Sequence, residues 1–552
     1  MINVGISRQH NSSVTFLKDG DIVFYIENER LSRIKYDTFP FNALFKIKDF
    51  TDYIDNLCIT GLTRIAPHGE FSITSADIYS EFVLRLNKSF FEQGFRTHDL
   101  GLDHHKMHAS CAFYNSGFKE AICIISDGMG SEYYFDNDNF YGREITSVFS
   151  CEYPAKFEVI EKHVSYPSNL PHHIAHLPPE IEINNTLGPA TAFSITSEAF
   201  GLSGLDAGKV MGMASYGKED LSLPPIYKDG KINKEFFLIR NNTFHDSILN
   251  LECNEFQDQA NFAFSLQKET QTNMKKYIHD IIDKTKCKNI CLSGGFFLNC
   301  VANYEYLDGL PEDVNLYIEP NSSDAGTSIG AAKYIWHSET RDTTIRKQNT
   351  LYYGPEPDYN VKDKLNKNES ITEVNYEDVI SLILEGSPVA LYQGRSEAGP
   401  RALGNRSILY DPRDKNGKDV VNKIKKREWY RPFAGTVLYE KANEWFDMRG
   451  LEESPYMLYA VKVRKHRVNR IPAITHVDET CRVQTLKKNQ NLHFYNLIKL
   501  FYDKTGVPIL FNTSLNLSGD PLVETLDDAL YTLRNTNLNY LYLPEIKSMI
   551  YG

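Results

Sequence analysis

Four side chains in this sequence have the types and spacing of a metal site. His104 and His108 are four residues apart, and Asp127 and Asp324 stand in Ser-Asp-Gly and Ser-Asp-Ala-Gly contexts. Residues four apart on a helix share one face, about 5–6 Å apart at Cβ, so both imidazoles can bind one ion. Imidazole and carboxylate ligands suit iron(II), zinc or manganese, and the absence of a cysteine ligand argues against a structural zinc site. The alternative is a surface histidine pair beside two ordinary turn aspartates.

The elements that carry these side chains follow from local signals. Asp103 as N-cap and Gly117 as stop predict a helix over residues 104–116. Three segments share the order apolar strand, small polar turn, helix: 121–130, 289–300 and 315–330. Their glycines let the backbone approach a ligand closely, and N–H groups in such turns bind anions; the candidates are Gly128, Gly130, Gly294 and Gly295. Metal and phosphate binding together are therefore predicted for this part of the chain.

The first residues predict a strand–turn–strand opening. Residues 2–7, 13–17 and 21–27 are short β-rich runs, and a Lys-Asp-Gly turn separates the last two. This opening suits the nucleotide-binding fold of actin, sugar kinases and heat-shock ATPases. No GxxxxGK motif followed by Ser or Thr and no GxGxxG motif occurs, which disfavours P-loop and Rossmann folds. The histidine-rich stretch 163–176 is expected to be a loop near the acceptor pocket.

Composition limits the classes of function. The 552 residues suffice for two to four domains. The net charge of −12 disfavours binding to nucleic acid or to anionic membranes. Nine cysteines without a CxxC pair, and no recognisable signal sequence, predict a reducing, cytoplasmic setting. The apolar runs are far shorter than the roughly 20 residues that span a bilayer.

The last part of the chain has a different character. Residues 351–375 are polar and predict an interdomain linker, with one domain at 1–350 and another at 376–552. Residues 392–413 and 422–433 hold many arginines and lysines among glycine, proline and aromatic residues. Arginine binds phosphate oxygens bidentately and lysine supplies a compact charge. An RNA site would need a net basic surface, so a small, multiply charged phosphate ligand is the better interpretation.

Together the motifs resemble the O-carbamoyltransferase family of antibiotic and nodulation-factor tailoring enzymes. The resemblance covers essentially the whole chain and rests on short segments in a fixed order. They are HHKMHAS (104–110), ISDGMGS (125–131), GKVMGMASYG (208–217), LSGGFFLN (292–299), NSSDAGTSIGAA (321–332), GRSEAGPRALGNRSIL (394–409), REWYRPFAG (427–435), HVDETCRVQ (476–484) and FNTSLN (511–516).

The resemblance implies an α/β protein with two domains. The first would have a duplicated actin-like, sugar-kinase-like fold, and the second would be an α/β domain similar to threonylcarbamoyl-adenylate synthase. The second domain would make carbamoyl-adenylate from carbamoyl phosphate and ATP, with magnesium expected alongside the nucleotide. The first would pass the carbamoyl group to a hydroxyl of a small-molecule acceptor, with iron(II), or else zinc or manganese, bound at the four ligands.

The same resemblance implies roles for particular residues. His10 and Lys35 would face the transfer site, His10 as a general base; many members are expected to have an acidic residue after this histidine, where this sequence has Asn11. Lys425 and Arg427 would act in adenylate formation. Ligand-binding residues would be Asn299, Arg401, Arg482, Asn512, Ser514 and Asn516.

Three alternatives remain open at this stage. Carbamoyl transfer to a protein thiolate, as in hydrogenase maturation, would be expected with additional CxxC-bearing modules. Threonylcarbamoyl transfer to tRNA is disfavoured by the acidic charge. A non-enzymatic actin-like binding module would leave the cations of 376–552 unexplained. No nucleic-acid or membrane partner is expected, and a homodimer is left open.

Overall fold

The chain folds into two compact units. The computed structural model describes residues 1–8, 10–61, 76–134, 141–165, 180–184, 187–233, 235–240, 243–249 and 253–552. One unit comprises residues 1–28, 36–302 and 309–349, and the other 29–35, 303–308 and 350–552. Most of the histidine-rich stretch, 166–179, lies outside the described residues. No described helix has an apolar stretch long enough to cross a membrane.

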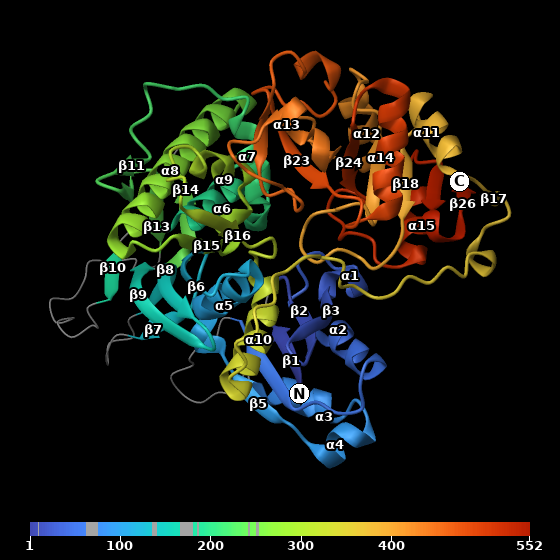
Figure 1. Cartoon of the computed structure of the whole chain (residues 1–552). Helices are drawn as coiled ribbons and strands as arrows, with labels where there is room; N and C mark the ends of the chain where they lie inside the picture. The colour runs from blue at the N-terminus through green and yellow to red at the C-terminus, as the bar shows by residue number, and fades with distance from the viewer. Residues whose placement is uncertain are drawn as a thin grey trace. The chain divides into compact units, whose positions relative to one another are not determined.

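The first unit contains the same sheet topology twice (Figure 1). In each copy three antiparallel strands are followed by two strands parallel to the first strand of the copy. The first sheet has the order β3 (Asp21–Glu27), β2 (Ser13–Lys18), β1 (Ile2–Ser7), β4 (Asn56–Thr60) and β5 (Arg96–Asp99). The second has the corresponding order β9 (Lys156–Ser165), β8 (Tyr141–Glu152), β6 (Glu120–Ser126), β15 (Asn289–Ser293) and β16 (Asn315–Ile318). The duplicated α/β architecture expected from the sequence is confirmed.

Additional elements surround these two sheets. β10 (Ile181–Asn184) and β7 (Glu132–Tyr134) extend the second sheet, while β11 (Tyr227–Lys228) pairs β12 (Lys231–Ile232) and β13 (Phe237–Arg240) pairs β14 (Thr243–Leu249). The helices are α2 (Phe41–Phe45), α3 (Ala76–Leu84), α4 (Lys88–Gln93), α5 (His104–Ser116), α6 (Pro189–Ala199), α7 (Ala207–Ala214), α8 (Phe256–Thr285) and α10 (Thr327–Thr340). α1 (Asn28–Ser32) and α9 (Cys300–Tyr306) begin in this unit and end in the other.

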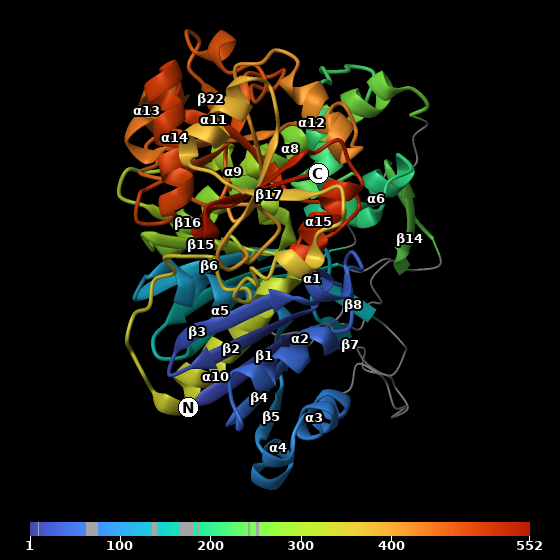
Figure 2. The same cartoon turned by 90° about the vertical axis from the view of Figure 1, so that its right-hand side faces the viewer.

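Two helices lie between the two sheets and contact each other (Figure 2). α5 follows the first sheet in sequence but packs on β6, β8 and β15, whereas α10 follows the second sheet and packs on β1, β2 and β4. Every residue of α5 except Lys106 is buried, because a sheet covers one side and α10 another. The repeat therefore brings the beginnings of α5 and α10 together with the turns that follow β1 and β6.

The helix predicted over 104–116 is confirmed, but its start is capped differently. Asp103 lies in a short 3₁₀ turn and its side chain makes no cap hydrogen bond. The His104 N–H instead donates to Ser131 Oγ at 3.3 Å, from the loop after β6. Gly117 ends the helix in the left-handed region at φ 82°, as predicted.

The second unit is built around a mixed sheet. Its order is β17 (Ser370–Glu373), β26 (Ser548–Tyr551), β25 (Tyr540–Leu543), β18 (Val389–Tyr392), β19 (Arg406–Tyr410), β24 (Ile509–Ser514), β20 (Ala434–Leu438), β23 (Thr480–Leu486), β22 (Ala460–Val463) and β21 (Phe446–Asp447). Its helices are α11 (Tyr376–Leu384), α12 (Gly417–Lys425), α13 (Ala442–Trp445), α14 (Leu492–Thr505) and α15 (Leu526–Arg534). The α/β class predicted for this region is confirmed.

The polar segment predicted as a linker, 351–375, belongs to this second unit. Val361 is buried in its core, and β17 pairs with β26 at the sheet edge. An edge strand contacts the sheet on one side only, so exposed polar residues such as Ser370 and Glu373 are compatible with it. The polarity marks the sheet edge rather than a free connection.

The crossing of α5 and α10 requires a residue without a side chain. A Cβ on Gly330 would lie 2.0 Å from the backbone oxygen of Met107, so the helices touch through their backbones there. We expect Gly330→Ala to lower the free energy of unfolding by about 1–3 kcal/mol, because two packed helices must separate. Gly208→Ala is the matched control: nothing lies within 4 Å of its Cβ, and its helix should be unchanged or slightly more stable. Equal urea midpoints for both variants would contradict this account of the crossing.

Candidate functional site

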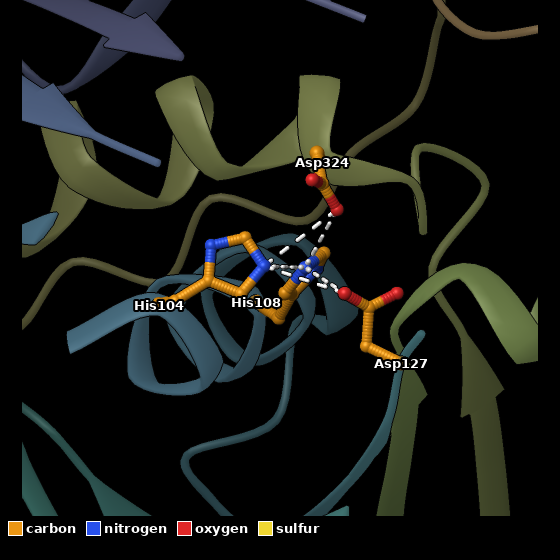
Figure 3. A group of neighbouring side chains, drawn as sticks. All are labelled: His104, His108, Asp127 and Asp324. Atoms are coloured by element: carbon orange, nitrogen blue, oxygen red, sulfur yellow. Dashed lines mark hydrogen bonds and ion pairs between the residues drawn. The ribbon is translucent and has the colours of Figure 1, made fainter. Parts of the chain in front are cut away.

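The four predicted metal ligands meet in the first unit (Figure 3). His104 and His108 come from the first turns of α5, Asp127 follows β6, and Asp324 precedes α10. One ligand atom from each lies within 4.8 Å of the other three, and all four residues are buried. The i, i+4 spacing on α5 thus acts as predicted.

The distances between the ligand atoms suit one shared ion. The two Nε2 atoms lie 3.2 Å apart. His104 Nε2 lies 3.4 Å from Asp127 Oδ2 and 3.6 Å from Asp324 Oδ1, and His108 Nε2 lies 3.9 and 3.6 Å from the same two oxygens. A metal bound at about 2.0–2.1 Å places tetrahedral ligand atoms about 3.4 Å apart. Two nitrogens and two carboxylate oxygens therefore converge at the spacing of a first-row transition-metal site.

The electrostatics of the cluster also suit a cation. Burial lowers the pKa of His104, but the carboxylates of Asp324 and Asp127 outweigh it and raise that pKa to about 10. Burial raises the pKa of Asp324, yet the charges of His10 and His104 hold it well below its usual range. Two buried carboxylates thus need positive charge nearby, which a divalent ion supplies more compactly than protonated imidazoles.

Backbone and side-chain groups fix the Asp127 carboxylate. The Gly295 N–H donates to Asp127 Oδ1 at 2.8 Å, which leaves Oδ2 toward the histidines. Gly294, with φ +99°, allows this approach, since a Cβ there would meet the Ser126 backbone oxygen at 2.2 Å. Gly294 and Gly295, predicted to approach a phosphate, therefore contact Ser126 and Asp127 in the loop that carries the metal ligand.

The other two predicted glycines differ from each other. Nothing lies within 4 Å of a Cβ built on Gly128, so its backbone faces open space, as a ligand-binding turn requires. A Cβ on Gly130 would instead lie 2.6 Å from His105 Nε2 and 2.7 Å from Glu144 Oε2. Gly130 thus makes room for a buried pair of side chains.

Sequence reasoning missed the residues that tie this loop to α5. Glu144 accepts from the Ser131 N–H, the Ser147 hydroxyl and Lys162 Nζ, while Ser131 Oγ accepts from the His104 N–H and donates to the Leu102 oxygen. Burial raises the pKa of Glu144, but His105 and Lys162 lower it to about 2, so it stays a carboxylate. Ser131 is the last residue of the motif ISDGMGS (125–131), so the sequence could have pointed to it. Glu144 lies in no such motif.

His10 lies beside the cluster, and Asn11 stands where an acid was expected. His10 Nε2 is 3.3 Å from Asp324 Oδ2, and its side chain is 41% exposed, so a substrate can approach it. Its Nδ1 lies 3.2 Å from Asn11 Oδ1. Each ring nitrogen of His10 thus faces an oxygen acceptor. A metal bound to Asp324 would take up that carboxylate and leave Nε2 able to accept a proton from a substrate.

Lys35 and Asn299 have different surroundings from those expected. Lys35 belongs to the second unit, where Nζ pairs with Glu29 Oε1 at 2.7 Å. Asn299 exchanges two hydrogen bonds with the amide of Gln267, at 2.9 and 3.2 Å, and accepts the Ala302 N–H at the start of α9. These partners assign Asn299 a structural role in the described chain.

In the second unit, the predicted residues Lys425, Ser514 and Asn516 meet. Lys425 Nζ donates to the hydroxyl and backbone oxygens of Ser514 and to the side-chain and backbone oxygens of Asn516. Burial lowers the pKa of Lys425 well below its usual value, and Arg427 and Arg431 lower it further. Neutral oxygens thus hold a buried cation that is repelled by two neighbouring cations.

Lys425, Arg427, Arg431 and Arg482 form a cationic group, and Arg427 lies within it. Arg427 Nη2 donates to the Pro432 oxygen at 2.7 Å, and its guanidinium lies 4.3 Å over the Phe433 ring. Burial lowers its pKa well below the usual value, and the like charges of Arg431 and Arg482 add to this effect. Concentrated buried positive charge of this kind is stabilised by a multivalent anion.

One face of the sheet organises this cationic group. Gln484 follows Arg482 by two residues on β23, and Ser514 follows Asn512 by two on β24, so each pair shares a face. Gln484 Nε2 and Asn512 Nδ2 donate to the oxygens of Leu403 and Ala402, in the loop that carries Arg401. Asn512, predicted to bind ligand, therefore supports the Arg401 loop in the described structure.

Comparisons with known proteins agree with these two parts. Residues 71–333 match the family description "Carbamoyltransferase N-terminus" and residues 380–548 "Carbamoyltransferase C-terminus". The chain belongs to the carbamoyltransferase family. It is 31% identical to the nodulation protein NolO of Bradyrhizobium diazoefficiens, over 80% of this chain and 77% of NolO. This carbamoyltransferase is an enzyme, and the resemblance stated from its motifs is confirmed.

The chain is also similar to other proteins. The 3'-hydroxymethylcephem-O-carbamoyltransferase of Streptomyces clavuligerus is 29% identical, over 63% of this chain and 64% of that protein. An uncharacterised protein of Methanocaldococcus jannaschii is 30% identical over 98% of both chains. Among solved structures, T. kodakarensis HypF is 14% identical with a TM-score of 0.35, over 62% of this chain and 49% of that chain.

We expect the purified enzyme to contain about one equivalent of a transition metal, because four ligand atoms converge without a cysteine. His108→Ala and Asp324→Ala should each reduce the bound metal at least tenfold, measured by elemental analysis after gel filtration. His466→Ala, at an exposed position, is the control and should retain full metal. Active wild-type enzyme without stoichiometric metal would contradict the assignment.

Proposed function

We propose that this enzyme is an ATP-dependent O-carbamoyltransferase that works in two steps, one in each unit. The observation that carries the first step is the buried cationic group around Lys425 and Arg427, in which burial and the like charges of neighbouring arginines lower the pKa of both residues. The second step is supported by the His/Asp cluster with His10 at its exposed side. Relatives named as O-carbamoyltransferases support a hydroxyl as the acceptor.

In the first step, carbamoyl phosphate loses its phosphate to water and gives carbamate. A carbamate oxygen then attacks the α-phosphorus of ATP, an O–P bond forms, and the bond to pyrophosphate breaks. Carbamoyl-adenylate, phosphate and pyrophosphate are the products. Several negative charges must come within a few ångströms, so catalysis depends on cations that offset their repulsion and position them.

The residues of the second unit have properties that suit this step. Lys425 is held by four oxygens, so its ammonium is placed before substrate arrives. Arg427 and Arg482 provide guanidinium groups for phosphate oxygens, and Arg401 lies in a loop held by Gln484 and Asn512. Ser514 and Asn516 orient the lysine. Magnesium is expected to accompany ATP.

In the second step, an acceptor hydroxyl attacks the carbonyl carbon of carbamoyl-adenylate. A new C–O ester bond forms, the bond to the AMP phosphate breaks, and AMP leaves. His10 Nε2 takes the hydroxyl proton, with Asn11 holding the opposite ring nitrogen. A metal on His104, His108, Asp127 and Asp324, which we propose is iron(II), would supply Lewis acidity toward the phosphate oxygens.

The acceptor is proposed to be a small natural product or sugar, and the setting cytoplasmic. The acidic net charge of −12 supports neither nucleic-acid nor anionic-membrane partners. A screen of hydroxyl compounds with carbamoyl phosphate and ATP, followed by mass spectrometry for a carbamoyl mass gain, tests the proposal directly. Pyrophosphate release that does not depend on carbamoyl phosphate would overturn it.

Lys425→Ala should lower carbamoyl phosphate-dependent pyrophosphate release about ten- to a hundredfold, because a charge-assisted bond in a desolvated site contributes about 1.5–3 kcal/mol. Transfer from externally supplied carbamoyl-adenylate should remain. The matched control is Lys423→Ala, on the exposed side of the same helix, which should behave as wild type. Wild-type pyrophosphate release by Lys425→Ala would remove the first step from this unit.

His10→Ala should separate the two steps. Pyrophosphate release should stay within about twofold of wild type, whereas acceptor carbamoylation should fall ~10²–10⁴-fold, as expected when a general base is lost. The readouts are pyrophosphate by coupled assay and the carbamoylated acceptor by mass spectrometry. If His10→Ala transfers the carbamoyl group at full rate, the histidine has a structural role.

A further inference from the structure

Asn422 is a buried side chain whose hydrogen-bonding groups are both unused. It lies on α12, is 7% exposed, and neither Nδ2 nor Oδ1 has a hydrogen-bond partner among the described residues. Leaving a buried polar group unpaired costs about 1–3 kcal/mol, so unpaired groups in folded proteins usually have a reason. An amide unpaired at both ends indicates a ligand that donates to one end and accepts from the other.

The position of Asn422 connects it with the cationic group. It precedes Lys425 by three residues on α12, so the two side chains are neighbours on one face of the helix. Lys423, between them, is exposed on another face. After the helix the chain turns back, and the Arg427 N–H donates to the Asn422 backbone oxygen at 3.3 Å. The free amide therefore belongs to the surroundings of the two cations expected to bind phosphate.

The same feature occurs once more in the described chain, at Asn321. Both polar atoms of its side chain are buried without a partner, and the residue precedes Asp324 by three. These are the two asparagines among the described residues whose side-chain nitrogen and oxygen are both buried and unpaired. One lies next to each charged cluster, which argues against an accident of packing.

We propose that Asn422 is the specificity residue that recognises the amide of the carbamoyl group. Its Nδ2 donates to the carbamoyl oxygen, and its Oδ1 accepts from the carbamoyl NH₂, while Lys425 and Arg427 bind the neighbouring phosphate. This inference rests on the proposed function and names the part of the substrate that this unit distinguishes. An acyl phosphate with a methyl group in place of NH₂ would leave Oδ1 unpaired.

The adenine edge has a similar donor–acceptor pattern and also pairs with asparagine. The carbamoyl group is the better match, because it is joined directly to the phosphate that the neighbouring cations would bind. The adenine base is separated from the reacting phosphate by the ribose. The experiment below distinguishes recognition of the carbamoyl group from recognition of adenine.

The test uses the full-length chain and two stable probes, carbamoylphosphonate and acetylphosphonate, which have equal charge and differ at NH₂ against CH₃. Isothermal titration calorimetry should show wild type preferring carbamoylphosphonate at least tenfold, because a site with a buried acceptor rejects the analogue that lacks the donor. Asn422→Leu should bind both probes equally, whereas Asn422→Asp keeps the acceptor for NH₂ but loses the donor to the carbonyl oxygen, so it should bind both probes more weakly and still prefer carbamoylphosphonate. The KM for ATP should stay within twofold in both variants.

Thermal unfolding supplies a readout that a structural role would not give. Asn422→Leu should unfold at the wild-type temperature or above, because it removes an unpaired amide and keeps the volume. The control is Asn3→Leu: Asn3 is also buried, but its amide donates to the Ala332 oxygen and accepts from Asn56. That variant should unfold at a lower temperature.

Three results would overturn the inference. Equal binding of both probes by wild type would show that the NH₂ is not recognised. An unchanged preference in Asn422→Leu would assign the recognition to another residue. A rise in the KM for ATP alone would point to the adenine edge. Failure of the proposed function is separate, since wild type would then bind neither probe and release no pyrophosphate with carbamoyl phosphate.

Discussion

The close crossing of α5 and α10 is the contact on which the first site depends. The Ser110 hydroxyl donates to the Gly330 oxygen at 2.7 Å, and the absent side chain of Gly330 lets the helix backbones meet. Further along, the buried Lys333 donates to Asn115, which donates to Glu319. These bonds fix the two helices along their length. As a result, ligands separated by about two hundred residues in sequence converge at the helix starts.

The internal repeat explains why the four ligands and His10 come from four separate places. The turns after β1 and β6 are equivalent in the two copies and carry His10 and Asp127. The helices that end each copy, α5 and α10, carry the histidines and Asp324 near their first turns. Each copy contributes one turn and one helix start, so a single site forms where the two copies meet within this unit.

Each unit buries a cluster of charged groups. The cluster of the first unit suits a cation, and that of the second unit suits an anion. The first brings two carboxylates toward two imidazoles, which raises the pKa of His104 and lowers the pKa of Asp127 and of Asp324. The second brings Lys425 and Arg427 together with further arginines, and lowers the pKa of both. Neither arrangement stabilises a fold by itself, because removing charges of this kind from water costs free energy. A cation at one site and an anion at the other balance that cost.

Several of the predicted residues have protein partners that support the sites. Asn299 pairs with Gln267, Asn512 holds the Arg401 loop, and Gly130 leaves space for His105. Their residue types, an amide or a glycine in a turn, are the same ones that ligand contacts use. Only the identity of the neighbouring atoms separates the two roles. Those neighbours come from strands and helices that are distant in sequence.

Local sequence determined the elements and the chemistry they carry. The helix over 104–116, the strands at 2–7 and 289–293, and the i, i+4 histidines follow from periodicity, turn residues and stop signals within a few positions. The arginines and lysines of 392–413 and 422–433 predicted an anion site, because they are clustered within short segments. Tertiary structure decided which atoms meet. Asp127 is fixed by the Gly295 N–H, α5 is capped by Ser131 instead of Asp103, and the polar segment 351–375 contributes the edge strand β17 to a sheet. Such contacts depend on how one element packs against another that is far away in the sequence. No local sequence pattern specifies which elements pack together or which of their atoms meet.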